Sequence, residues 1–97
     1  MAAIRTFHLD LLFLGVHGIS ERGGFTTPNL MEADTDRALV AAAEKLIVLA
    51  DHSKWDLLGI STIAALPEAH VVITDSGLSR SAQETLREAV GELILAG

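Results

Sequence analysis

A run of five aliphatic residues, Leu46 to Ala50, stops abruptly at Asp51 and constrains the fold more than any other stretch. Because the run is continuous rather than alternating, it predicts a strand that is buried on both faces. Four polar residues, Asp51-His52-Ser53-Lys54, follow it directly. Ligands of open α/β sheets bind at the carboxyl ends of strands, and a lysine there suits a phosphate or carboxylate. The residues alone favour a simpler interpretation, in which Asp51 caps the next turn and Lys54 is solvated.

Short aliphatic runs alternate with polar or amphipathic segments along the chain. This alternation is typical of an α/β fold in which parallel strands are joined by right-handed crossovers. The predicted strands, all buried, cover residues 9–16, 46–50, 71–74 and 93–95. The predicted helices cover about residues 27–44 and 81–90, and residues 56–65 are expected to be irregular or helical. The loops that follow the first three strands carry polar residues, and in a parallel sheet they should form one row along an edge.

A glycine-rich loop, Glu21 to Thr27, precedes the first predicted helix. Within it, Gly23-Gly24 allows a positive φ or a close approach of the backbone to a ligand. Two start signals compete for the helix: Thr27-Pro28 as cap and first residue, or a capping box from Asn29 to Glu32. Glu32 could instead contact a ligand or transfer a proton, but the spacing alone favours the capping role.

Helical periodicity predicts which side chains the two helices bury. In the first helix, Met31, Ala38 and Ala42 lie close to one stripe, and Asp36 lies largely off it. The last helix is expected to begin at a capping box, Ser81 to Glu84, and to end at Gly91.

The composition excludes several classes of function. The net charge of −6 argues against a chain that binds DNA or an anionic membrane by itself, because phosphate contact needs a basic face. There is no cysteine, which excludes disulfides, thiolate metal sites and a cysteine nucleophile. The longest apolar run, Leu11 to Val16, is far shorter than the roughly 20 residues of a transmembrane helix.

Motifs for nucleotide binding and hydrolysis are also missing. The sequence has no G-x-G-x-x-G, no Walker lysine motif and no G-x-S-x-G elbow. The histidines lack the spacing of metal ligands; they are His8, His17, His52 and His70. We therefore predict no metal, no cofactor and no catalytic residue.

Four blocks follow one another along the chain: FLGVHGIS (13–20), GGFTTPNLMEA (23–33), VLADHSKW (48–55) and VITD (72–75). In order and spacing, these blocks resemble the effector-sensing domain of the DeoR family of bacterial transcriptional regulators. The family usually joins an N-terminal winged helix-turn-helix to a C-terminal domain that binds phosphorylated sugars. That domain is similar to ribose-5-phosphate isomerase and glucosamine-6-phosphate deaminase. The resemblance thus implies a Rossmann-like half domain with a parallel sheet.

The resemblance also implies roles for individual residues. Lys54 matches the lysine of an Asp-x-Ser-Lys loop that contacts substrate phosphate in the wider group, and Glu32 matches a carboxylate that acts there in proton transfer. The anion is expected beside Lys54, near Gly23-Gly24, with Asn29 and Glu32 facing the same cleft. The predicted ligand-binding residues are Lys54, Glu32, Asn29, Gly18, Gly23, Gly24 and Asp51.

The sequence departs from the family in what it lacks. Neither a helix-turn-helix nor the first Gly/Thr-rich loop, which supplies most phosphate-binding amides, is present. We therefore expect residues 1–97 to be the C-terminal part of a cytoplasmic sensor domain that contacts no membrane. DNA would be bound only through a helix-turn-helix domain absent from this chain. The uncovered surfaces of such a part should drive self-association into a homodimer or a higher oligomer.

Three functions fit these residues. The leading one is the effector-sensing and oligomerisation part of a repressor that responds to a phosphorylated sugar. The alternative is a phosphosugar isomerase-like enzyme with Glu32 as base, which is weakened because His17 and Ser20 stand in a loop where isomerases typically have acids. The third is a module that acts only by pairing with full-length regulators.

Overall fold

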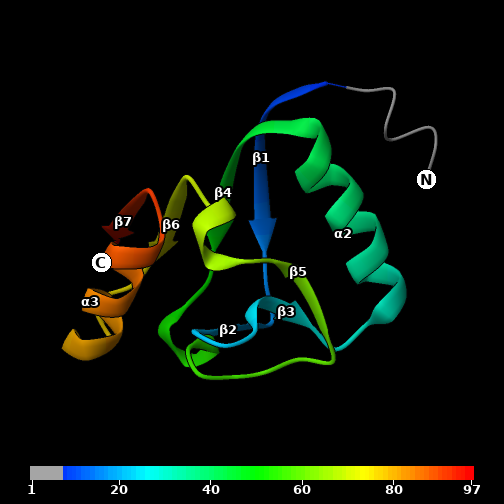
Figure 1. Ribbon diagram of the computed structural model, residues 1–97. Helices are drawn as coiled ribbons and strands as arrows, with labels where there is room; N and C mark the ends of the chain where they lie inside the picture. The colour runs from blue at the N-terminus through cyan, green and yellow to red at the C-terminus, as the bar shows by residue number, and fades with distance from the viewer. Residues whose placement is uncertain (1–7) are drawn as a thin grey trace.

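Four parallel strands form the main sheet of the computed structural model, which describes residues 8–97 (Figure 1). Their order across the sheet is β1-β4-β6-β7. The strands are β1 (Leu9–Gly15), β4 (Ala43–Leu49), β6 (Val71–Thr74) and β7 (Glu92–Leu95). The long helices are α2 (Leu30–Ala42) and α3 (Arg80–Ala89). The predicted α/β class with a parallel sheet is therefore confirmed.

A second, antiparallel sheet lies beyond the carboxyl end of β1 (Figure 1). It contains β2 (Gly18–Ser20), β3 (Gly24–Thr27) and β5 (Ser61–Ala64). The predictions of a loop at residues 21–27 and of a helical or irregular segment at 56–65 were wrong where β3 and β5 form. These strands are too short for an alternation of apolar and polar residues to be recognised in the sequence. In addition, β3 buries two threonines, a residue type that is common in loops.

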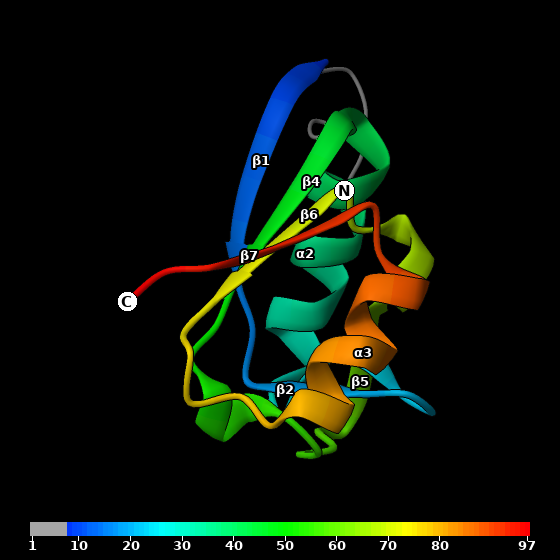
Figure 2. The same cartoon turned by 90° about the vertical axis from the view of Figure 1, so that its left-hand side faces the viewer.

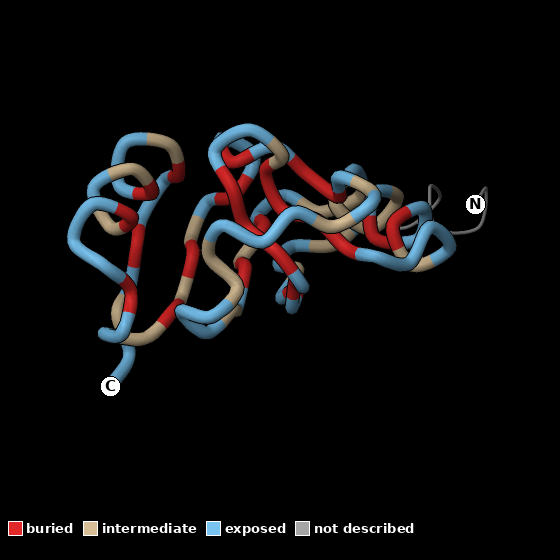
Figure 3. Tube along the Cα trace, turned by 90° about the horizontal axis from the view of Figure 1, so that it is seen from below, coloured by how far each residue is buried: buried red, intermediate tan, exposed pale blue. Residues whose placement is uncertain are grey.

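Both long helices cover the same face of the main sheet (Figure 2). On that inner face, Leu14, Val48, Val72 and Leu93 stand side by side in register, and all four are buried. In Figure 3 the burial colours change repeatedly along the chain, as expected where strands have one covered face. The core therefore lies between the helices and one side of the sheet.

On the other face of the main sheet, here called the outer face, no helix from residues 8–97 lies over the strands (Figure 2). Leu11 and Phe13 of β1 are 51% and 57% exposed, and Leu49 of β4 is 40% exposed. The predictions that both strands are buried on two faces were therefore wrong. Continuous apolar runs look the same whether or not both faces are covered. The large apolar residues of the outer face are Leu9, Leu11, Phe13, Ile47, Leu49, Val71, Ile73 and Ile94.

The helices differ from the predictions in detail. In α2 the buried residues are Ala33 and Asp36, whereas Met31 is 84% exposed, so the predicted stripe was wrong. Alanines on several sides of this helix make its periodicity weak. In α3 the cap is Ser79, whose side chain accepts the Ala82 N–H at 3.2 Å, so the helix begins earlier than the predicted box at Ser81.

Candidate functional site

The carboxyl ends of β1 and β4 border an open cavity of about 530 Å³. Its lining comes from the end of each strand and the loop behind it: Gly15, Val16, His17, Leu49, Ala50, Asp51 and Lys54. The loop after β4 and the loop after β1 therefore meet, as the predicted row of strand ends requires. We call this space the Lys54 cavity.

Lys54 is held by the short 3₁₀ helix η1 (His52–Lys54), which follows β4. Asp51 caps this helix, because its Oδ1 accepts the Ser53 N–H at 2.8 Å and also the Ser53 hydroxyl. These hydrogen bonds from Ser53 hold the pKa of the Asp51 carboxyl below its usual range. The Lys54 N–H donates to the Asp51 carbonyl at 3.1 Å. Asp51 thus has the capping role that the simpler interpretation gave it, and it also lines the cavity.

Glu32 lies next to His17 and is not part of the cavity lining. The two atoms His17 Nε2 and Glu32 Oε1 are 3.8 Å apart. The backbone N–H of His17 donates to the Thr26 carbonyl at 3.2 Å, which fixes the start of the loop after β1. His17 therefore stands between the Lys54 cavity and the predicted carboxylate.

Asn29 is the cap of α2. Its Oδ1 accepts the N–H groups of Met31 and Glu32, both at 3.0 Å. The helix starts at the Asn29 cap rather than at Thr27, although among residues 8–97 the Glu32 side chain does not accept the Asn29 N–H, so the reciprocal half of the predicted capping box is not formed. The side-chain oxygen of Asn29 thus already accepts two hydrogen bonds within the protein.

The three predicted glycines have local structural roles. A Cβ at Gly18 would lie 2.3 Å from the Leu57 carbonyl oxygen, so this strand position has no room for a side chain. Gly24 has a φ of 71° and lines a different cavity, of about 360 Å³, beside η2 (Leu66–Glu68) and α3. Gly23 lies in the turn between β2 and β3. The structure does not bring Gly23 or Gly24 into the lining of the Lys54 cavity.

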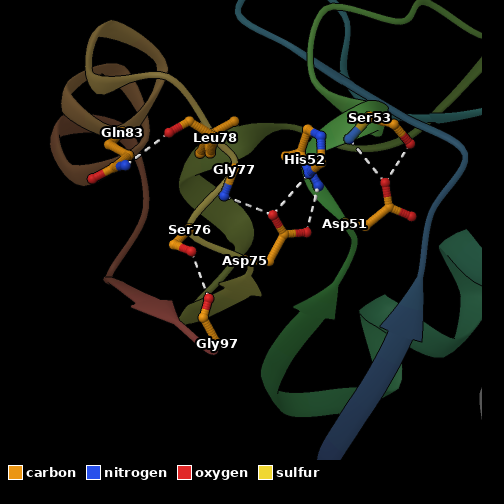
Figure 4. A network of polar contacts seen from close by, with 9 residues as sticks. All are labelled: Asp51, His52, Ser53, Asp75, Ser76, Gly77, Leu78, Gln83 and Gly97. Carbon is orange, nitrogen blue, oxygen red and sulfur yellow. Dashed lines mark hydrogen bonds and ion pairs between the residues drawn. The ribbon is translucent and has the colours of Figure 1, made fainter.

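The loops after β4 and β6 are joined by a histidine–aspartate pair (Figure 4). Asp75 Oδ1 lies 2.8 Å from His52 Nδ1, and Asp75 Oδ2 accepts the His52 backbone N–H at 3.0 Å. These bonds and one from the Gly77 N–H hold the pKa of Asp75 below its usual range. The sequence analysis placed both residues in the row of strand ends but did not predict the contact between them. Their positions directly after two strands that neighbour each other in the sheet would have indicated this contact.

Asp36, one turn beyond Glu32 in α2, is the buried acid that sequence reasoning missed. It is 7% exposed, and its Oδ2 has no hydrogen-bond partner among residues 8–97. Burial raises the pKa of the Asp36 carboxyl, and the charge of Glu32 raises it further, while His17 opposes them. An unsatisfied buried group destabilises a fold, so this position carries a cost in stability.

Replacing Asp36 by asparagine should stabilise the fold at neutral pH. Folding raises the pKa of the Asp36 carboxyl above 3.8, the ordinary pKa of an aspartate. The stability that the protonated carboxyl contributes is therefore present below pH 3.8 and is lost as the pH rises above that value. Removing the charge should gain roughly 1 kcal/mol, or about 4–8 °C in Tm for a domain of this size. Thermal melts at several pH values test this, with the exposed Asp34→Asn as the matched control. A gain that is equal at pH 4 and pH 7 would contradict it.

Two absences bear on the function. Residues 8–97 contain no group of three or more His, Cys, Asp or Glu side chains arranged to hold a metal ion. In the same part of the chain, no helix is both long and apolar enough to cross a membrane.

Comparisons with known proteins identify the family. The DeoR C-terminal sensor domain matches residues 1–76. The putative aga operon transcriptional repressor of Escherichia coli is 35% identical over 95 residues, which are 98% of this chain and 35% of the repressor. The transcriptional repressor AccR of Agrobacterium fabrum is 36% identical over 86 residues, which are 88% of this chain and 33% of the repressor.

A third relative, the HTH-type transcriptional regulator GlpR of Haloferax volcanii, is 35% identical over 82 residues, or 84% of this chain and 32% of the regulator. The chain spans about a third of the length of these curated relatives. The match to the sensor domain covers the loops that form the Lys54 cavity. This chain therefore belongs to the DeoR family of transcriptional regulators, and its matched part is the family's C-terminal sensor domain.

Proposed function

We propose that this chain is the effector-sensing and oligomerisation part of a transcriptional repressor, and that it binds a phosphorylated sugar in the Lys54 cavity. The observation that carries the proposal is the position of Lys54, behind a central strand and in the wall of a cavity of about 530 Å³. Small-molecule pockets typically measure about 300–1,000 Å³, so the volume of this cavity is in the range expected for a ligand as small as a sugar phosphate.

The electrostatics of the chain make Lys54 the natural anion contact. The chain is acidic, and its only other lysine, Lys45, lies on β4 before the cavity. An ammonium on a flexible stem binds phosphate as a point charge. The proposal therefore assigns the phosphate to Lys54 and leaves the sugar to the neighbouring strand ends.

Binding without turnover is favoured over an isomerase-like reaction with Glu32 as base. Glu32 lies beside His17 and is not among the residues that line the cavity, which argues against its use as the base. The relatives that match are named as transcriptional regulators. GlpR is named as an HTH-type regulator, and in the proposed function DNA contact would likewise come from a helix-turn-helix domain outside residues 1–97, with the cytoplasm as the site of action.

Calorimetric titration of the purified chain tests the proposal. Ribose 5-phosphate and glucosamine 6-phosphate should bind, whereas ribose and glucosamine should not, because the ammonium of Lys54 has no anion to contact. Equal behaviour of phosphorylated and unphosphorylated sugars would contradict the proposal. Conversion of either phosphate ester during incubation, followed by nuclear magnetic resonance, would instead support the isomerase-like alternative.

A further inference from the structure

We infer that Asp75 is a positioning residue of the ligand site: its carboxylate fastens the start of η1 to the end of β6 and thereby sets where Lys54 stands. This inference rests on the proposed function and deepens it, because it assigns the order of the lysine loop to a residue on a neighbouring strand. Asp75 is not among the residues that line the Lys54 cavity, so its effect on the ligand passes through η1.

The Asp75 carboxylate accepts three hydrogen bonds (Figure 4). Its Oδ2 accepts the His52 backbone N–H at 3.0 Å, and its Oδ1 lies 2.8 Å from His52 Nδ1. Oδ1 also accepts the Gly77 N–H at 2.8 Å. A carboxylate can only accept, so His52 Nδ1 is the donor in this pair. Two of the three bonds therefore hold the first residue of η1, one by its backbone and one by its side chain.

The contact is closely packed. β4 and β6 are adjacent parallel strands with Leu49 in register with Ile73, so the loops that follow them begin side by side. A Cβ at Gly77 would lie 2.6 Å from His52 Nδ1 and 2.8 Å from Asp75 Oδ1. Only a glycine lets the backbone approach the pair this closely, and the two side chains have little room for another arrangement.

The other end of η1 is anchored separately. Trp55, directly after η1, forms a parallel bridge with Ile19 of β2, and the Asp56 N–H donates to the Ile19 carbonyl at 2.7 Å. Lys54 is the last residue of η1 and thus lies between the two anchors. A single 3₁₀ turn has poor hydrogen-bond geometry and little stability of its own. The anchors therefore decide where the lysine begins.

The charge of Asp75 predicts the opposite effect to its hydrogen bonds. A carboxylate near the loop repels a phosphate, so a role through charge alone would make its removal strengthen anion binding. A role through η1 makes the same removal weaken binding, because Lys54 loses its fixed starting point. The direction of the change thus separates positioning from simple electrostatics.

The test begins with Asp75→Asn and calorimetric titration of the purified chain with glucosamine 6-phosphate. Asparagine keeps the shape but replaces one acceptor oxygen by an amide nitrogen, which cannot accept an N–H. Binding should weaken about tenfold, although the variant has lost a negative charge. The control is Ser76→Ala in the same loop, whose hydroxyl donates to the Gly97 carbonyl and not to η1; it should bind as the unmodified chain. Unchanged or tighter binding by Asp75→Asn would overturn the inference.

A double variant shows whether Asp75 acts through the lysine. Residues that act through one contact are not additive, so Asp75→Asn should cause no further loss in a chain that already carries Lys54→Ala. A further tenfold loss in the double variant would mean that Asp75 contributes independently of Lys54, and the inference would be wrong. General destabilisation of the fold would also weaken binding in both backgrounds.

A second pair of variants tests the same anchor from the side of His52. Asparagine at this position places its amide nitrogen where Nδ1 lies and keeps a donor, whereas leucine has the same branching and no donor. His52→Leu should weaken binding about fivefold, and His52→Asn should restore most of the affinity. Equal affinities of the two variants would contradict the inference, and this comparison holds even if Asp75→Asn fails to fold.

Trp55 supplies a readout without ligand, because it is the one tryptophan of the chain and follows η1 directly. Acrylamide should quench its fluorescence more strongly in Asp75→Asn and His52→Leu than in the unmodified chain, Ser76→Ala or His52→Asn. Equal quenching in all five proteins would show that η1 keeps its place without the anchor, and the inference would fail.

Failure of the inference differs from failure of the proposed function. If Lys54→Ala weakens binding but Asp75→Asn and His52→Leu do not, the inference fails and the proposed function stands. If the unmodified chain does not distinguish phosphorylated from unphosphorylated sugars, the proposed function fails and this inference with it.

Discussion

Replacing Lys54 by alanine should weaken sugar-phosphate binding about 10- to 150-fold. A hydrogen bond to a charged group contributes about 1.5–3 kcal/mol, and each 1.4 kcal/mol is a factor of ten in affinity. The expected loss is large because Lys54 is the lysine that lines the cavity. Without its positive charge, the acidic Asp51 in the same lining would repel the phosphate. Calorimetry with ribose 5-phosphate and glucosamine 6-phosphate measures the change.

Lys45→Ala is the matched control for this experiment. Lys45 is the other lysine of the chain, and it lies on β4 away from the cavity. Both variants lose one positive charge, so any general effect of net charge on anion binding is the same in both. Equal affinities of the two variants would show that Lys54 is a solvated loop residue. A Lys54→Arg variant should retain part of the affinity, because it keeps the charge but changes its geometry.

The main sheet was predictable because its strands are continuous aliphatic runs that end at polar loops. The abrupt change from Ala50 to Asp51 lies directly after the end of β4 at Leu49, as the sequence predicted. The small sheet was not predictable, since its strands have three or four residues and bury threonines. The hydroxyl oxygen of one of these buried threonines, Thr26, accepts the Gly59 N–H at 2.8 Å. Such a contact joins residues that are distant in the sequence, so no local pattern predicts it.

The site was predictable as a set of loops but not as a set of contacts. The row of strand ends follows from the alternation of elements, and it brought His17 and Lys54 to one cavity. The position of Glu32 beside His17 depends on the angle at which α2 leaves the small sheet, which no local pattern encodes. For the same reason the buried face of α2 and its unpartnered Asp36 could not be read from the periodicity.

Replacing Phe13 by aspartate should prevent the self-association that we propose for this chain. Phe13 is 57% exposed and stands on the edge strand β1 beside Ile47, in a row that continues across the outer face to Val71. Faces of parallel sheets are normally covered, so a second copy is the proposed cover here. Loss of a large aromatic contact, together with burial of an aspartate against the apolar row of a second copy, should cost about 2 kcal/mol, so the dissociation constant should rise about 30-fold.

A second copy suits this face because the face is self-complementary in charge. Lys45 and Glu92 are the charged residues in register with its apolar rows, and they lie on different strands, β4 and β7. A two-fold related copy can thus set a lysine toward a glutamate without burying like charges together. Four strands about 4.8 Å apart give a face only roughly 15–20 Å wide, so association should be reversible and dependent on concentration.

Sedimentation velocity from about 1 to 100 µM measures this association, a range chosen because small interfaces are typically weak. Met31→Asp is the matched control: Met31 is 84% exposed and belongs to α2, which covers the inner face of the sheet. The control should associate as the unmodified chain does. Because Phe13 is already largely exposed in the single chain, its replacement should leave the thermal unfolding of the monomer nearly unchanged at low concentration. A single monomeric species of the unmodified chain across the whole range would refute the proposed dimer face, and equal loss of association in both variants would place the interface elsewhere.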